Sequence, residues 1–148
     1  MKTTYCIAQL NLGYLKFSRS SKQMCSYLKN LEKVMEFVLN DPGFIWIHEK
    51  DTTEIVHKFF GKNAAANLST WISVDHLQKF MMSKLHLQVM GRREEWFVSQ
   101  KEETFVMWYV PEGHKPTFYE AKERLEFFRI NGQTEYAFND LFGYSKAP

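Results

Sequence analysis

The sequence predicts an α+β fold: a ferredoxin-like β-α-β-β-α-β unit with a four-stranded antiparallel sheet, followed by a C-terminal helix. Three observations predict it. Short stretches with alternating apolar residues and longer stretches with apolar residues every three or four positions follow one another in this order. No repeat or linker-like tract interrupts the 148 residues, which suffice for one core. We therefore treat residues 1–148 as a single domain whose C-terminal helix and tail begin at about residue 116.

The first half of the chain contains three predicted strands and one helix. Residues 4–15, "TYCIAQLNLGYL", alternate as a strand does. Between Ser21 and Leu39 the apolar residues at 24, 28, 31, 35 and 38 form a helical stripe, which Ser20 or Ser21 can cap and the turn at 40–43 ends. Strands at 43–49, "GFIWIHE", and 65–73, "AANLSTWIS", flank a polar loop around 49–54.

The second half supplies two more helical regions and the last strand. Ser73 can cap a helix that bends near Ser83 and continues through residues 84–97. Residues 104–110, "TFVMWYV", read as a strand ended by Pro111. Thr117 and Glu120 form a capping box for a helix that Gly132 ends. The apolar stripe of this helix consists of Phe118, Ala121, Leu125 and Phe128.

The first three strands have two different faces. With helices on one face only, the other face must meet solvent, a ligand or a second subunit. An apolar set suits a dry sheet-on-sheet contact in a homodimer; it comprises Leu10, Leu12, Ile45, Ile47, Leu68 and Ile72. A polar and aromatic set suits a small-molecule pocket, or a half-solvated face whose Trp residues pack under helices; it comprises Gln9, Asn11, Trp46, His48, Asn67, Ser69 and Trp71.

Composition argues against several classes of protein. No run of about 18 apolar residues could span a membrane, and the first residues do not resemble a secretory signal. Cys6 and Cys25 form no metal-type cluster, which favours a reduced, cytoplasmic location. The 19 basic and 17 acidic residues are mixed along the chain, so a nucleic-acid partner is not expected. No zinc pattern, activated nucleophile or nucleotide-binding loop is present, and no metal site is predicted.

One helical face in residues 84–97 joins polar and apolar side chains. His86, Met90, Arg93 and Phe97 are spaced four, three and four residues apart, which places them on one side. The His86 imidazole could be a general base or a metal or haem ligand, or could instead hold the helix bend. Arg93 could bind a substrate carboxylate or enolate, or pair with a nearby Glu at 94, 95 or 120.

The chain resembles a bacterial family, the domain of unknown function 3291, which belongs to the dimeric α+β barrel superfamily. The resemblance covers residues 5–130. Its motifs are Asn11, Pro42-Gly43-Phe44, Trp46, Asn67-Leu68-Ser69-Thr70-Trp71, Ser73, His86, Arg93, Glu95-Trp96-Phe97, "MWYVPEGHKPT" and "EAKERLE".

This resemblance implies that two subunits pair their sheets into a barrel and that each binds a ligand between sheet and helices. The superfamily includes antibiotic-biosynthesis monooxygenases that need no cofactor, and haem-degrading enzymes. The monooxygenases often share a pattern that this chain follows at Trp71, Ser73, Leu77, Ser83 and His86. Phe80 stands where that pattern has another His, which removes one candidate proton-transfer group.

Three functional hypotheses follow. The first is a homodimeric, cofactor-independent, monooxygenase-like enzyme for an aromatic or polyketide-like small molecule, with His86 as base and Arg93 as anion-binding partner. Its substrate oxygens would be oriented by Gln9, Asn11 and Asn67, and its rings would be enclosed by Trp46, Trp71, Trp96 and Trp108. The second is a haem or hydrophobic-ligand protein with His86 as axial ligand. The third is a dimeric structural domain in which the helix face is core.

Overall fold

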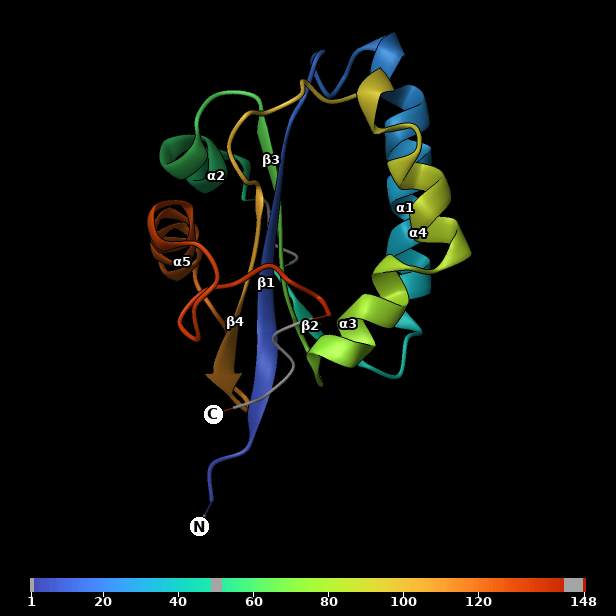
Figure 1. Ribbon diagram of the computed structural model, residues 1–148. Helices are drawn as coiled ribbons and strands as arrows, with labels where there is room; N and C mark the ends of the chain where they lie inside the picture. The colour runs from blue at the N-terminus through green and yellow to red at the C-terminus, as the bar shows by residue number, and fades with distance from the viewer. Residues whose placement is uncertain (1, 49–51, 143–147) are drawn as a thin grey trace.

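A four-stranded antiparallel sheet lies between two layers of helices (Figure 1). The computed structural model describes residues 2–48, 52–142 and 148. The strands are β1 (Tyr5–Tyr14), β2 (Phe44–Ile47), β3 (Ala64–Trp71) and β4 (Phe105–Pro111), in the order β2-β3-β1-β4. The predicted four-stranded antiparallel sheet is confirmed, with β1 between β3 and β4.

Helices α2 (Thr53–Phe60) and α5 (Phe118–Asn131) cover one face of the sheet. Cys6, Ala8 and Leu10 of β1 pack there against buried residues of both helices, such as Val56 and Leu125. The prediction of helices on one face only is therefore wrong. Part of the predicted polar loop, residues 49–51, lies outside the described residues, but α2 begins where the rest of that loop was expected.

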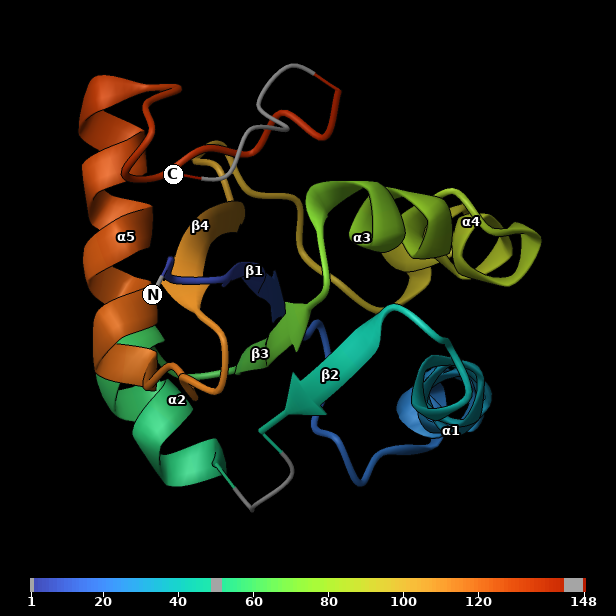
Figure 2. The same cartoon turned by 90° about the horizontal axis from the view of Figure 1, so that it is seen from below.

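Helices α1 (Cys25–Leu39), α3 (Val74–Met81) and α4 (Lys84–Met90) lie along the other face, with short 3-10 turns η1 (Lys22–Met24) and η2 (Arg93–Glu95) (Figure 2). A second core forms here, where Ile7, Trp71 and Met107 of the sheet meet Leu77 and Phe80 of α3. The predicted break near residue 83 is confirmed, because α3 ends at residue 81 and α4 begins at residue 84.

Strand β2 follows the predicted face at Phe44 but not at Trp46. A β-bulge lies between Phe44 and Trp46, so Phe44 packs on the second core whereas Trp46 packs on the first. Ile47 lies on the side of the sheet that faces α1 and α3, where it borders the cleft described below. Ile45 is exposed. The apolar set predicted for a dimer contact is thus divided, and its members on the first core are covered by helices of the same chain.

The chain ends by returning to the edge of the sheet. The Thr117 hydroxyl accepts a hydrogen bond from the Glu120 N–H at 3.1 Å, and Gly132, with φ of 72°, follows α5, as the capping pattern predicted. Phe138 then pairs with Met107 of β4, and both residues are fully buried. Within the described ranges, every helix is too short or too polar to cross a membrane.

Candidate functional site

A cleft of about 690 Å³ separates part of the sheet from helices α1 and α4. Its floor includes Gly13 and Ala65, which lie directly opposite each other on β1 and β3. Helix α1 lines it with Tyr27 and Leu31, and Phe97, just after η2, closes one end. The volume is typical of small-molecule sites. The prediction of a hollow between sheet and helices is therefore supported by the geometry.

A smaller recess of about 70 Å³ continues from the cleft. Asn11, Ile47 and Asn67 border both spaces, which places the two side by side. The recess is also bordered by Gln9, Ser69, Trp71, Phe80 and His86. The predicted residues Gln9, Asn11, Asn67, Trp71 and His86 are thus brought together at one place.

A hydrogen-bond network connects the polar residues of the recess. The Gln9 side-chain amide donates to Asn67 Oδ1 at 2.8 Å and to Ser69 Oγ at 2.7 Å. The Trp71 indole N–H donates to the same Ser69 oxygen at 3.0 Å. Ser69 accepts both bonds through its oxygen, so the hydrogen of the Ser69 hydroxyl takes part in neither of them. That hydrogen is therefore available to a ligand in the recess.

His86 is fixed in one tautomer by the backbone. Its Nδ1 lies 2.8 Å from the Met81 carbonyl oxygen, which can only accept, so Nδ1 carries the hydrogen and Nε2 keeps its lone pair. The ring packs against Phe80, with centroids 5.0 Å apart. Burial lowers the pKa of His86 below its usual 6.5, and the bond to Met81 opposes that shift. His86 is therefore a neutral base at neutral pH.

Two arginines border the larger cleft. Arg93 was predicted, and Arg19, in the segment before α1, was not. Two of the three glutamates expected to pair with Arg93 are engaged elsewhere: Glu95 binds Arg92 at 2.7 Å, and Glu120 binds His114 at 2.7 Å. Tyr27 was also missed, although its position four residues before Leu31 on the helical stripe was a usable signal.

Two of the Trp residues predicted to enclose the ligand lie on the face of the sheet that α2 and α5 cover. Trp108 pairs with Ala8 in register and shares its face, where the indole N–H donates to Glu120 of α5 at 2.7 Å. Trp46 follows the bulge onto the same face, next to His48. Both are core residues under α2 and α5, and the prediction that they enclose a ligand is wrong.

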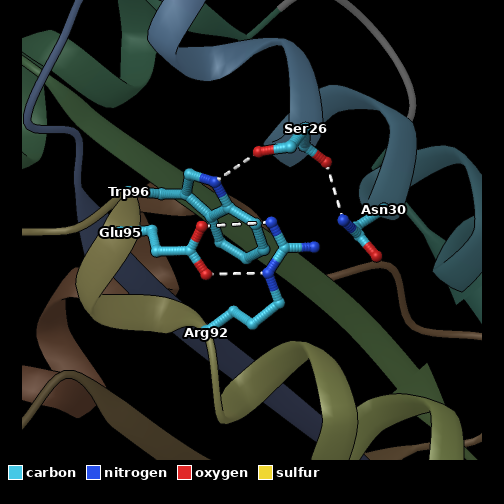
Figure 3. Close-up of polar contacts among 5 residues, drawn as sticks. All are labelled: Ser26, Asn30, Arg92, Glu95 and Trp96. Atoms are coloured by element: carbon cyan, nitrogen blue, oxygen red, sulfur yellow. Dashed lines mark hydrogen bonds and ion pairs between the residues drawn. The ribbon is translucent and has the colours of Figure 1, made fainter.

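Trp96 is buried and is not among the residues that line the cleft. Figure 3 shows its contacts with Ser26 and Arg92. Its indole N–H donates to Ser26 Oγ of α1 at 3.0 Å, and the Arg92 guanidinium lies 5.0 Å from its ring centroid. Arg92 is itself held by Glu95. Trp96 thus fastens η2 to α1 and positions its neighbours Arg93 and Phe97 at the cleft.

Two of the remaining histidines, His76 and His114, have local hydrogen-bond partners. His114 bonds to Glu120, and His76 Nδ1 lies 2.7 Å from Ser73 Oγ. Across the described part of the chain, no three His, Cys, Asp or Glu side chains are grouped as a metal site would require.

Comparisons with known proteins identify a family and a fold. The family model described as "Domain of unknown function (DUF3291)" matches residues 6–146, which extends past the resemblance expected from motifs. A conserved protein from Methanosarcina mazei Go1 is similar in structure, with a TM-score of 0.50 and 10% identity over 72% of this chain and 92% of that one. NE2512, a protein of unknown function from Nitrosomonas europaea, is also similar in structure, with a TM-score of 0.50 and 9% identity over 78% of this chain and 97% of that one. No curated protein matches the chain.

Proposed function

The chain belongs to the family of domains of unknown function 3291, and we propose that it is a cofactor-independent, monooxygenase-like enzyme for an aromatic or polyketide-like small molecule. The observation that supports this most is a neutral His86 at a polar recess beside a cleft of small-molecule size. A base held in one tautomer with a lowered pKa suits proton abstraction near neutral pH.

The recess supplies the other group that such a reaction needs. Removing a proton from a phenol or from carbon next to a carbonyl leaves negative charge on an oxygen, and preorganised donors stabilise that charge. The Ser69 hydroxyl hydrogen, held in place by Gln9 and Trp71, is one such donor. His86 is then the base, and Gln9, Asn11 and Asn67 orient the substrate oxygens.

The oxidation itself balances without an external reductant. An activated CH2 group plus O2 gives C=O plus H2O, in which the carbon supplies the electrons and one oxygen atom leaves as water. His86 takes the first carbon-bound proton, and the carbanion adds O2 and takes that proton back to give a hydroperoxide. Loss of the second carbon-bound proton with cleavage of the O–O bond then forms the C=O group and releases water with both hydrogens. The protein's contribution is to hold the carbanion and to exclude bulk water.

The ferredoxin-like assignment is part of this proposal and is supported by the strand order β2-β3-β1-β4. The homodimer stays a prediction. A pairing through the face predicted for it would require α2 and α5 to move away, because both helices cover that face. The mass in solution tests the dimer, since a single chain is 17.6 kDa.

A haem bound through His86 does not fit the geometry. The recess that the imidazole borders is about 70 Å³, far smaller than a macrocycle. We therefore derive no step through an iron centre.

Oxygen uptake with a panel of anthrone-type and naphthol-type phenols tests the proposal. His86→Ala should lower uptake by about 10²-fold or more, the usual contribution of a general base, while the circular dichroism spectrum stays native. His57→Ala, which removes an exposed imidazole on α2, is the matched control and should keep full activity. No uptake with the whole panel, or equal uptake by the His86 variant, would refute the proposal.

A further inference from the structure

We infer that the cleft takes a flat aromatic anion, with its carboxylate, sulfonate or phosphate group bound at the mouth by Arg19 and Arg93. The inference deepens the proposed function and rests on it only for the direction in which the ligand lies. It starts from how the arginines of the chain are used. Arg92, Arg124 and Arg129 all bind protein oxygens.

Arg19 and Arg93 differ from these three. Within the residues that the structure describes, neither side chain has a hydrogen bond or an ion pair, and both border the same cleft. Both are exposed, as side chains at an entrance must be. Unused guanidinium groups that meet at one cavity are the donor set that carboxylates, sulfonates and phosphates select.

Among the described residues that line the cleft, the charged side chains are both arginines. No Asp or Glu is among the described residues that line it. Glu95, two residues after Arg93, forms two hydrogen bonds with Arg92. A partly enclosed cavity with low-dielectric walls concentrates the field of its charges. The described lining therefore favours an anion over a cation.

The interior favours a flat apolar body. On the floor, Gly13 has no side chain and Ala65 has only a methyl group. A Cβ on Gly13 would overlap the Phe97 ring, so that ring lies directly on the strand. Tyr27 meets Phe97 edge to face, with centroids 5.3 Å apart and planes at 89°. Opposite the floor lie aliphatic side chains of α1, Leu31 and Met35.

The two ends of the space then have different chemistry. Arginines lie at the exposed mouth, and the neutral His86 with its hydrogen-bond network lies in the adjoining recess. An aromatic anion placed with its charged group on the arginines has its opposite edge toward His86. The proposed reaction takes place at that edge.

A pair of fluorescent probes with the same aromatic body tests the inference. 8-Anilinonaphthalene-1-sulfonate carries one negative charge, and N-phenyl-1-naphthylamine lacks the sulfonate. The anion should bind the full chain more tightly. Arg19→Gln and Arg93→Gln should each weaken anion binding by about three- to tenfold, the range for a charged hydrogen bond at an exposed site, and leave the neutral probe within about twofold.

Three variants sharpen the result. Lys33→Gln removes an exposed positive charge on α1 away from the cleft and should change neither probe. Ala65→Phe fills the floor and should weaken both probes, which locates them in the cleft. His86→Ala should keep the preference for the anion even if turnover is lost.

Equal binding of the two probes, or arginine variants that match Lys33→Gln, would overturn the inference. Arginine-dependent binding of the sulfonate without any oxygen uptake would leave the anion site standing and refute only the proposed reaction. Oxygen uptake that is insensitive to both arginine substitutions would leave the proposed reaction standing and refute only the anion site.

Discussion

The bond between Trp96 and Ser26 should be coupled energetically, because it joins η2 to α1 across the end of the cleft (Figure 3). Ser26→Ala removes the acceptor and leaves the indole N–H of a residue that is 1% exposed without a partner. Trp96→Phe removes the donor and part of the ring. The double variant removes both polar groups, so the unpaired N–H no longer exists.

An unpaired buried donor costs about 1–3 kcal/mol. Ser26→Ala should therefore lower the free energy of unfolding by about that amount, which lowers the melting temperature by roughly 2–4 °C per kcal/mol for a chain of this size. In the double variant the cost of the serine change should shrink, giving a coupling energy of about 1 kcal/mol. The bond from the Asn30 side chain to the Ser26 backbone carbonyl, 2.7 Å long, stays in every variant.

Urea unfolding followed by far-ultraviolet circular dichroism measures all four corners of the cycle without relying on Trp96 fluorescence. Ser18→Ala is the control, because Ser18 is exposed and bonds only to the exposed Ser20 among the side-chain contacts described; it should stay within about 0.5 kcal/mol of the parent. Purely additive single changes, or a Ser26 variant as stable as the control, would show that Trp96 does not hold η2 to α1.

Three further outcomes are expected. Burial lowers the pKa of His86 below 6.5. Between the two pKa values the unfolded chain therefore binds a proton at this residue that the folded chain does not. The free energy of unfolding should fall as the pH drops below about 6.5 and level off below the folded pKa. His86→Gln should flatten this part of a urea-midpoint series from pH 5 to 8, and an unchanged slope would contradict the assignment. Glu120→Ala leaves the fully buried Trp108 indole without its acceptor and should lower the free energy of unfolding by about 1–3 kcal/mol. Glu126→Ala, which breaks only an exposed pair with Lys122, should lower it by under about 0.5 kcal/mol. Equal thermal shifts of the two variants would count against the Trp108–Glu120 bond. Gly13→Val should clash with the Phe97 ring, lower the free energy of unfolding by about 1–3 kcal/mol and weaken binding of the neutral naphthylamine probe. Gly91→Ala, where the nearest atoms lie 3.5 Å away, should be close to neutral. Unaltered probe binding by the valine variant would show that Phe97 does not shape the cleft.

Local signals in the sequence predicted the local structure well. The capping box at Thr117 and Glu120 and the stripe through Leu125 identified α5, because these contacts lie within a few residues of one another. Helix α2 was missed, although Val56 and Phe60 are four residues apart on one face. Its eight residues were too short a run to weigh against the polar residues before it.

Non-local features were harder to predict. The bulge in β2 reverses the faces of Trp46 and its neighbours, and a four-residue strand has too few alternations to reveal such a shift. The side of the sheet on which Trp108 lies depends on its pairing with β1, which no spacing within β4 encodes.

At the candidate site, the spacing of His86 and Arg93 led to the right place, although the predicted helix through residue 97 ends at Met90 and Arg93 lies in η2. The polar positions of β1 and β3 also led there. The role of Arg19 could not be anticipated. It lies outside any periodic segment, and only the tertiary path of the chain brings it to the cleft. Periodicity identifies faces of elements but not the irregular segments that meet them.

Helices α1 and α4 are attached to the sheet less firmly than α5. Helix α5 buries four side chains, whereas α1 buries only Val38 over 15 residues and α4 buries none. Local opening of α1 and α4 should therefore expose less apolar surface than opening of α5, and their backbone amides should exchange with deuterium sooner than those of β1 and α5. A substrate can consequently enter between sheet and helices by a sub-global opening that leaves the core under α2 and α5 folded.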